Sequence, residues 1–233
     1  MFPIGPDGSL AMASDVQRPA GKGPHPRQEG PHPHAAFLTP DERFLYVPDL
    51  GADRIYIYQI DTVAGRLIPA DPAFCALRPG TGPRHLAFHP TLPFVYVIHE
   101  LDNTITQLRR DAENGQLSVL SSLSTLPEGT EEASFCADIH LTPDGRYLYG
   151  SNRGHDSLVG FRIDPATGQL TLLGHTPVRG SFPRNFAIHP DGKWLLVANQ
   201  KSDNIVAFRI QEDGVLAFQW ERSSPVPVCI QFF

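Results

Sequence analysis

The sequence is poor in cysteine, methionine and tryptophan, and it has no long apolar run. Its 233 residues include three Cys, two Met and two Trp. Cys75, Cys136 and Cys229 lie far apart and are odd in number, so they predict buried free thiols rather than a disulfide framework or a zinc site. No apolar stretch reaches the roughly 18 residues that a membrane-spanning helix needs. We therefore expect neither a bound metal nor a membrane partner.

Positive charge is also scarce. The chain has 19 Lys and Arg against 25 Asp and Glu, a net charge of −6. An acidic protein has no overall field that attracts nucleic acid, so none is expected as a partner, and an anionic ligand would need a local cluster of Arg or Lys. The first residues, MFPIGPDGSLAMAS, lack the basic and apolar regions of a secretory signal, which favours the cytoplasm.

Proline and glycine are abundant, with 23 and 20 residues. Short segments of alternating β-branched and aromatic residues lie between clusters of Pro, Gly, Asn and Asp. This pattern predicts many short strands joined by tight turns. No long stretch has a helical period, so helical solenoid repeats are excluded and an all-β fold is expected.

A four-fold repeat runs through the chain. Its copies read LTPDERFLYVPD, FHPTLPFVYVIHE, LTPDGRYLYGSN and IHPDGKWLLVAN. The four anchoring prolines, 50, 53 and 47 residues apart, are Pro40, Pro90, Pro143 and Pro190. An aromatic residue follows each proline by four positions, a second strand begins fifteen positions after it, and a Gly-x-Leu comes about ten residues later. Agreement at this many offsets indicates one structural unit repeated four times.

Each copy predicts four antiparallel strands, which is typical of a β-propeller blade. We interpret residues 1–233 as a single propeller domain. The predicted blades and the closing strand are 32–80, 82–130, 136–181, 183–227 and 228–233. WD40 repeats are excluded because the Gly-His and Trp-Asp signatures do not recur at each blade, and a calcium-dependent propeller is not favoured because no acidic ligand spacing recurs.

The two ends do not match a closed ring. Residues 1–10 resemble the end of a third strand with its Gly-x-Leu, while PVPVCIQFF at the other end resembles a first strand. One alternative is a strained five-blade ring that lacks one strand. The other, which we favour, is an open arc that lacks its N-terminal blades.

Several long motifs resemble the lactonase family of seven-bladed β-propellers. They are GPRHLAFHP, CADIHLTPDGRYLYGSNRGHDSLVGFRID and FPRNFAIHPDGKWLLVANQKSDNIVAFRI. The resemblance implies a ring of seven blades, no organic cofactor, and hydrolysis of a small anionic sugar lactone, 6-phosphogluconolactone in the pentose phosphate pathway. The missing blades imply that this chain is inactive alone. A carboxymuconate-cyclising enzyme and a non-enzymatic binding propeller stay open as alternatives.

The repeat also predicts where a site lies, because the start of the first strand and the end of the second meet at one rim of each blade. Polar side chains gather at these offsets instead of the Gly, Asn, Asp and Ser of an ordinary turn. Five and six positions before the prolines stand His34, Ala35, Arg84, His85, Ala137, Asp138, Arg184 and Asn185. Nine and ten positions after them stand Asp49, Leu50, His99, Glu100, Asn152, Arg153, Asn199 and Gln200.

The family resemblance implies a His, two Arg and a Glu at this rim. The matching residues are Glu100, His34, Arg84 and Arg153, with His32 and Arg184 as rivals. In this hypothesis Glu100 or His34 activates water, Arg84 stabilises the oxyanion or clamps a carboxylate, and Arg153 and Arg184 hold the anionic end.

Other residues are expected to bind substrate, and some of the candidates also have a purely structural interpretation. Substrate contacts are expected from Arg184, Asn185, His85 and Asn152. An ordinary ion pair between Glu100 and Arg84 is the alternative for those two. For His140, a lining histidine satisfied by its neighbours is favoured over a ligand-binding one.

Overall fold

The computed structural model describes residues 1–232, and their regular structure is entirely β. Sixteen strands form four four-stranded antiparallel sheets, and in each sheet the strands follow the order of the sequence. This confirms the all-β fold and the four copies of a four-stranded unit. No helix capable of crossing a membrane is found in the described residues.

The strand bounds follow the repeat. The first sheet contains β1 (Phe37–Leu38), β2 (Phe44–Asp49), β3 (Arg54–Asp61) and β4 (Arg66–Ala76). The second contains β5 (Pro83–Phe88), β6 (Phe94–His99), β7 (Thr104–Arg110) and β8 (Leu117–Ser124). The third contains β9 (Phe135–Leu141), β10 (Tyr147–Arg153), β11 (Ser157–Ile163) and β12 (Leu170–Pro177). The fourth contains β13 (Pro183–Ile188), β14 (Trp194–Asn199), β15 (Asn204–Ile210) and β16 (Leu216–Ser223).

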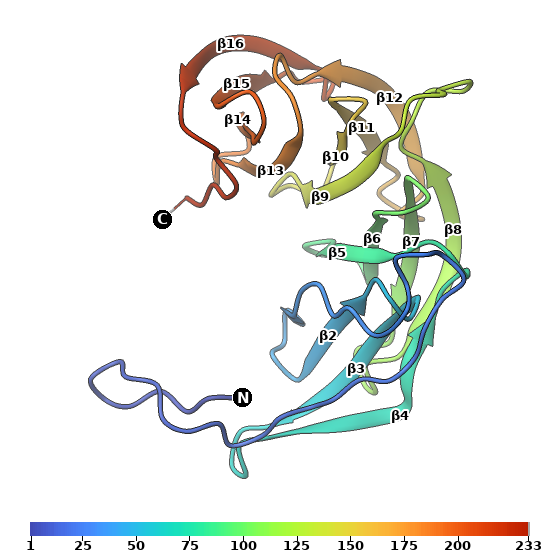
Figure 1. The fold of residues 1–233 in the computed structure, drawn as a ribbon, viewed down its shortest axis with the longest axis vertical. Helices are drawn as coiled ribbons and strands as arrows, with labels where there is room; N and C mark the ends of the chain where they lie inside the picture. The colour runs from blue at the N-terminus through green and yellow to red at the C-terminus, as the bar shows by residue number, and fades with distance from the viewer. Residues whose placement is uncertain (233) are drawn as a thin grey trace. The chain divides into compact units, whose positions relative to one another are not determined.

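The chain divides into two compact units. Unit 1 comprises Met1–Pro83 and Arg110–Ser118, and unit 2 comprises Arg84–Arg109 and Val119–Phe233. Unit 1 contains the first sheet, and unit 2 contains the third and fourth sheets and most of β5 to β7. In unit 2, β9 and β13 lie on the concave side while β12 and β16 lie on the convex side (Figure 1). The single domain expected from the sequence stays a prediction.

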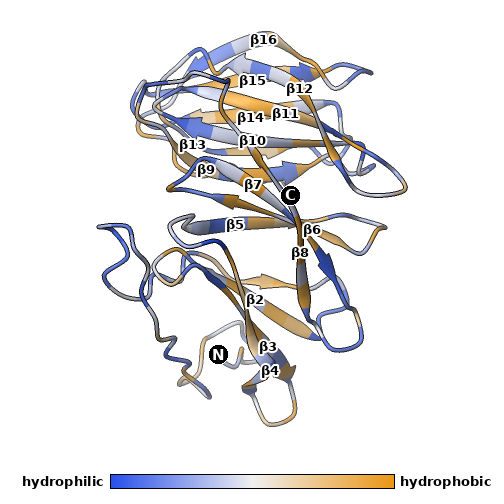
Figure 2. Cartoon of the chain, turned by 90° about the vertical axis from the view of Figure 1, so that its right-hand side faces the viewer, coloured by the Kyte–Doolittle hydropathy of each residue, from blue (hydrophilic) through white to orange (hydrophobic). Residues whose placement is uncertain are grey.

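Apolar side chains of unit 2 pack between consecutive sheets. One cluster joins Tyr96 and Ile98 of β6 to Ile139 of β9, and another joins Tyr149 of β10 to Phe186 of β13. Figure 2 shows β11 and β14 largely in orange, as expected for strands buried on both faces. Burial of these faces stabilises the stacking of sheets, at roughly 25 cal/mol for each Å² of apolar surface removed from water.

The Gly-x-Leu turns are explained by aromatic contacts from the preceding sheet. Tyr96 donates a hydrogen bond from its hydroxyl to the carbonyl of Gly168 at 2.7 Å, and Tyr149 does the same to Gly214 at 2.6 Å. Gly168 has a φ of 67°, and a Cβ there would lie 2.4 Å from the Phe94 ring. Only glycine fits such a turn without strain, because both the backbone and the ring exclude a side chain.

A second repeated turn positions the entry to each next sheet. Equivalent residues between the second and third strands have a left-handed backbone with φ from 51° to 54°; they are Asp53, Asn103, Asp156 and Asp203. Asn and Asp tolerate this conformation best among residues with a side chain. In unit 2, Asp156 accepts a hydrogen bond from the Phe182 amide at 2.7 Å, and Asn103 donates one to the Ser134 carbonyl at 2.8 Å. These contacts hold the segments that enter β13 and β9.

β-bulges interrupt two of these entry strands. On β9, Ala137 and Asp138 together oppose Ser151 of β10, and on β13, Arg184 is the extra residue between the pairs that Pro183 and Asn185 form with β14. A bulge bends the strand locally and re-aims its side chains. The first residues of β9 and β13 are therefore turned out of the regular alternation, at the rim where the sequence predicts a site.

The terminal segments differ from the repeat. Residues 1–36 contain no strand, and the predicted third-strand segment at 1–10 forms only an isolated antiparallel bridge between Ile4 and Leu10. Among the residues predicted as a closing strand, 228–232 form no strand. The amide of Ile230 instead donates to the side-chain oxygen of Asn185 at 2.6 Å. A strand needs a neighbouring backbone to pair with, and a side-chain contact does not supply one.

Candidate functional site

Three predicted site residues form one buried ion cluster in unit 2. Oε2 of Glu100 accepts hydrogen bonds from Nε of Arg84 at 3.0 Å and from Nη2 of Arg153 at 2.8 Å. Arg84, Glu100 and Arg153 are only 2%, 4% and 5% exposed. Two positive charges therefore share one carboxylate oxygen away from bulk water, where such interactions are stronger than at the surface.

Backbone carbonyls at the start of β9 hold both guanidinium groups. Nη1 of Arg84 donates to the carbonyl of Ala137, in the bulge, while Arg153 donates from Nε to Phe135 at 3.2 Å and from Nη2 to Cys136 at 2.8 Å. The fork of an arginine can satisfy several acceptors at once, which fixes its plane. Both side chains are thus preorganised by the chain itself.

In each guanidinium, one amino group makes no hydrogen bond that is found among residues 1–232, and the Arg153 guanidinium also lies over the Phe182 ring, with its Cζ 5.2 Å from the centroid. These groups are Nη2 of Arg84 and Nη1 of Arg153, and neither is among the buried unpaired atoms of the structure. Burial, and then the nearby Arg153 charge, lower the pKa of Arg84 to about 10, so Arg84 stays charged at neutral pH. Burial also lowers the pKa of Arg153, although Glu100 opposes this effect. The arrangement can stabilise an oxyanion or a carboxylate.

A second buried carboxylate, Asp138, lies beside this cluster. Its Oδ1 is 2.7 Å from Nδ1 of His85, and its Oδ2 is 3.1 Å from Nε2 of His140. Nε2 of His85 in turn lies 3.4 Å from Nη1 of Arg84. Burial would raise the pKa of Asp138, but His140 and then His85 hold it well below its usual range. Asp138 is therefore an anion at any physiological pH.

Asn185 and the backbone amides of Ile139 and Phe186 complete the surroundings of Asp138. Nδ2 of Asn185 donates to Oδ2 of Asp138 at 2.5 Å, while its Oδ1 accepts the Ile230 amide. The residues five positions before the prolines on β5, β9 and β13 are thus connected across three sheets as His85, Asp138 and Asn185. His85 and Asn185 both contact Asp138, and their contact with substrate stays a prediction.

The remaining predicted site residues have other surroundings in the structure. Asn152 is fully buried, and its amide donates to the Thr125 carbonyl and the Ser157 hydroxyl, so it ties β10 to neighbouring backbone. Arg184 is half-buried beside Asn185. His34 is exposed in unit 1, where its backbone amide donates to the Pro48 carbonyl at 2.9 Å.

The sequence-based hypothesis gave Asp138 no role and favoured a structural role for His140. Asp138 lies at a predicted offset, five positions before Pro143. His140 was expected to be satisfied by its neighbours, and it does bond to Asp138, yet 40% of its side chain is exposed. The signal available in the sequence was alternation, since residues two apart on a strand share one face.

Four successive four-stranded antiparallel sheets, with charged side chains at one end of their strands, define a β-propeller protein with a polar rim. Comparison with known proteins is more specific. A family model described as lactonase, 7-bladed beta-propeller, matches residues 1–232. The chain belongs to this lactonase family.

Individual relatives agree with the family. A 6-phosphogluconolactonase of Bacillus subtilis is 35% identical over 185 residues, which are 79% of this chain and 52% of the relative. One of Cronobacter sakazakii is 36% identical over 62% of this chain and 43% of the relative. The solved structure of a periplasmic gluconolactonase of Pseudomonas aeruginosa has a TM-score of 0.93 at 36% identity, covering 99% of this chain and 64% of that one. The chain spans about half the length of these curated relatives.

No group of three or more His, Cys, Asp or Glu side chains within residues 1–232 is arranged to hold a metal ion.

Proposed function

We propose that this chain provides part of the active site of a lactonase that hydrolyses an anionic sugar lactone, and that the substrate is 6-phosphogluconolactone. The observation that carries the proposal is the pair of guanidinium groups fixed on Glu100, each with an unused amino group. Fixed donors aimed at a developing oxyanion are a main source of catalysis in acyl transfer. The names of the Bacillus and Cronobacter relatives support the same reaction.

Within this proposal, Arg84 and Arg153 stabilise the negative charge that develops on the lactone carbonyl oxygen. Arg184 binds the phosphate, because it is half-buried near Arg84 and Arg153 and its charge lowers the pKa of both. Glu100 holds the two buried guanidinium groups in place. The catalytic role expected for His34 from the sequence stays a prediction.

A phosphorylated lactone also suggests a setting. The reaction would belong to the pentose phosphate pathway, and it would take place in the cytoplasm because charged sugar phosphates do not cross membranes unaided. The Pseudomonas neighbour, a periplasmic gluconolactonase, makes an unphosphorylated sugar lactone the natural competing substrate.

The test measures acid release in a pH-stat, corrected for spontaneous hydrolysis. It uses the 233-residue chain, and a chimera in which this chain replaces the matching segment of the Bacillus relative. For the chimera, we expect faster hydrolysis of 6-phosphogluconolactone than of gluconolactone. Arg84→Ala should lower kcat/KM about 10²–10³-fold. Arg184→Ala should raise KM for the phosphorylated lactone and leave gluconolactone unaffected.

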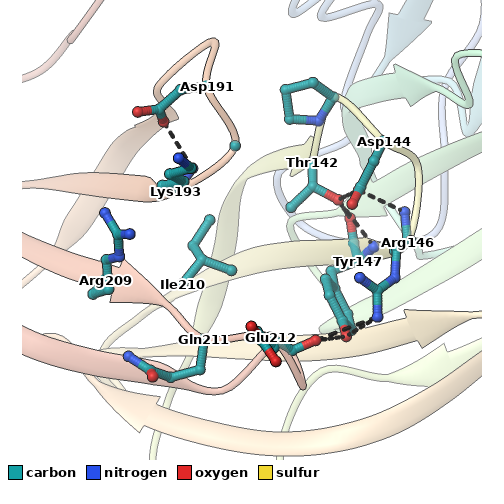
Figure 3. Close-up of a pocket in the computed structure, with 12 residues that line it drawn as sticks. Thr142, Asp144, Arg146, Tyr147, Asp191, Lys193, Arg209, Ile210, Gln211 and Glu212 are labelled. Atoms are coloured by element: carbon teal, nitrogen blue, oxygen red, sulfur yellow. Dashed lines mark hydrogen bonds between the residues drawn. The ribbon is translucent and has the colours of Figure 1, made fainter.

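Arg146→Ala is the matched control. Arg146 lies at the opposite end of the β9–β10 strands, in a groove of about 360 Å³, and donates to the Tyr147 hydroxyl and the Glu212 carbonyl (Figure 3). Its loss should leave the rate unchanged. Folded protein without any acceleration in chain and chimera would refute the proposal, and preferential cyclisation of a carboxymuconate would favour the cyclase alternative.

A further inference from the structure

The face of β9 that bears Asp138 also bears His140, two residues further along the strand. Asp138 is buried, whereas the His140 side chain reaches solvent. The His140 ring packs edge-on against Phe186, with centroids 4.9 Å apart and an interplanar angle of 84°. A buried carboxylate and an aromatic ring thus hold one solvent-reaching imidazole in a defined orientation.

The ionised state of Asp138 determines which ring nitrogens carry protons. A carboxylate only accepts hydrogen bonds, so both histidines must donate to it. His140 donates from Nε2 and His85 from Nδ1. In the neutral imidazoles the lone pairs then lie on Nδ1 of His140 and on Nε2 of His85.

The two lone pairs face different surroundings. Nε2 of His85 faces Nη1 of Arg84 at 3.4 Å, so a proton added there would meet a permanent positive charge. For Nδ1 of His140 no partner is found in the described part of the chain. His140 is therefore the better placed of the two to take a proton from water.

Glu100 is a poor candidate for the same task. Its Oε2 already accepts hydrogen bonds from two guanidinium groups, which stabilise the carboxylate and weaken it as a base. The connected series Arg84, His85, Asp138, His140 instead joins an oxyanion-stabilising group to a proton acceptor through successive polar contacts.

We infer that His140, oriented by Asp138, is the general base that activates water in this site; the inference rests on the lactone hydrolysis proposed above. Nδ1 of His140 takes a proton from water while the water oxygen bonds to the lactone carbonyl carbon. The carbonyl electron pair moves to its oxygen, next to Arg84 and Arg153. The tetrahedral species then collapses, the ring C–O bond breaks, and the ring oxygen leaves with the bonding pair and takes the proton from His140.

Asp138 acts in this scheme as a positioning residue. Its carboxylate keeps the proton of neutral His140 on Nε2 and stabilises the imidazolium that forms during the step. An asparagine at this position would be able to donate its own N–H to Nε2, which would move the proton to Nδ1 and block the base. The products are a hydroxyl and a carboxylic acid, and His140 returns to its neutral form.

The experiment measures kcat and KM for lactone hydrolysis in the chain and the chimera. His140→Ala should lower kcat about 10²–10⁴-fold, the usual contribution of a general base, and added imidazole should restore part of the rate. His140→Gln, which can still bond to Asp138 but has no basic nitrogen, should lose the same activity. Asp138→Asn should lower kcat at constant KM, with a change of the His140 tautomer visible in ¹⁵N NMR.

His189→Ala is the matched control, because His189 also pairs with an aspartate, Asp191 at 2.9 Å, and its side chain is 42% exposed. It should keep full activity. Full activity of folded His140→Gln in an active protein would overturn the role of His140 and leave the proposed function standing. Absence of lactone hydrolysis in the wild-type chain and chimera would instead overturn the proposed function and this role with it.

Discussion

Unit 2 contains two buried carboxylates that are balanced in different ways. Glu100 is held by Arg84 and Arg153, whose charges are permanent at any physiological pH. Asp138 is held by two histidines, which can give and take protons, and by the neutral N–H groups of Asn185, Ile139 and Phe186. Similar burial therefore supports two tasks: a fixed electrostatic brace at Glu100 and a proton-handling pair at Asp138.

The largest expected effect on stability comes from removing the negative charge of Glu100. Glu100→Gln should lower the free energy of unfolding by about 3–5 kcal/mol, because two buried guanidinium groups lose their counter-charge. Urea unfolding at neutral pH measures it. Glu212→Gln, at an exposed turn, should change stability by less than about 0.5 kcal/mol. Equal stability of the two variants would mean that the ion cluster contributes nothing to folding.

The acid dependence of stability should come next. The pKa of Asp138 is lowered in the folded protein, so its stabilisation is present above the unfolded-state pKa and is lost as the pH falls below it. Between pH 5 and pH 2.5, wild-type protein should lose about 2 kcal/mol more than Asp138→Asn. Urea unfolding across this pH range provides the measurement. Parallel curves for the two proteins would contradict the ionised pairing of Asp138.

The smallest effect is expected from Asn185→Ala. The variant removes one hydrogen bond to Asp138 and the acceptor of the Ile230 amide, so it should lower the free energy of unfolding by about 1 kcal/mol. Amide hydrogen exchange at Ile230 should become faster. Unchanged exchange there would show that Asn185 does not hold the C-terminal segment and acts on Asp138 alone.

Much of the fold could be predicted because its signals are local. The strand expected fifteen positions after each proline, at Ile55, Ile105, Leu158 and Ile205, is the third of its sheet, and in the structure each begins one residue earlier. The second-strand aromatics Phe44, Phe94, Tyr147 and Trp194 each open a strand. Alternation and turn residues act over a few positions, so sequence alone determines them. The terminal segments were predicted less accurately, because strand formation in segments such as 228–232 depends on pairing partners rather than on their own pattern.

The sequence predicted only the location of the candidate site, at one rim of the sheets, and not its contacts. The repeat offsets predicted that Arg84, Glu100 and Arg153 lie at one end of the strands, and in the structure these three side chains are in contact there. They could not show that Asn152 is enclosed by backbone contacts, or that Asp138 and His140 belong together with His85. Bulges on β9 and β13 re-aim these side chains, and a bulge has no clear signature in this sequence.

The sequence by itself determined the all-β repeat, the strand register and the gathering of charge at one rim, because each rests on short-range periodicity and turn chemistry. Tertiary structure decided which charged group meets which. Arg84 reaches Ala137 and His85 reaches Asp138 across 53 residues, and Asn185 reaches Asp138 across 47. Packing of consecutive sheets sets such distances, so the division between a braced Glu100 and a proton-handling Asp138 exists only in the folded chain.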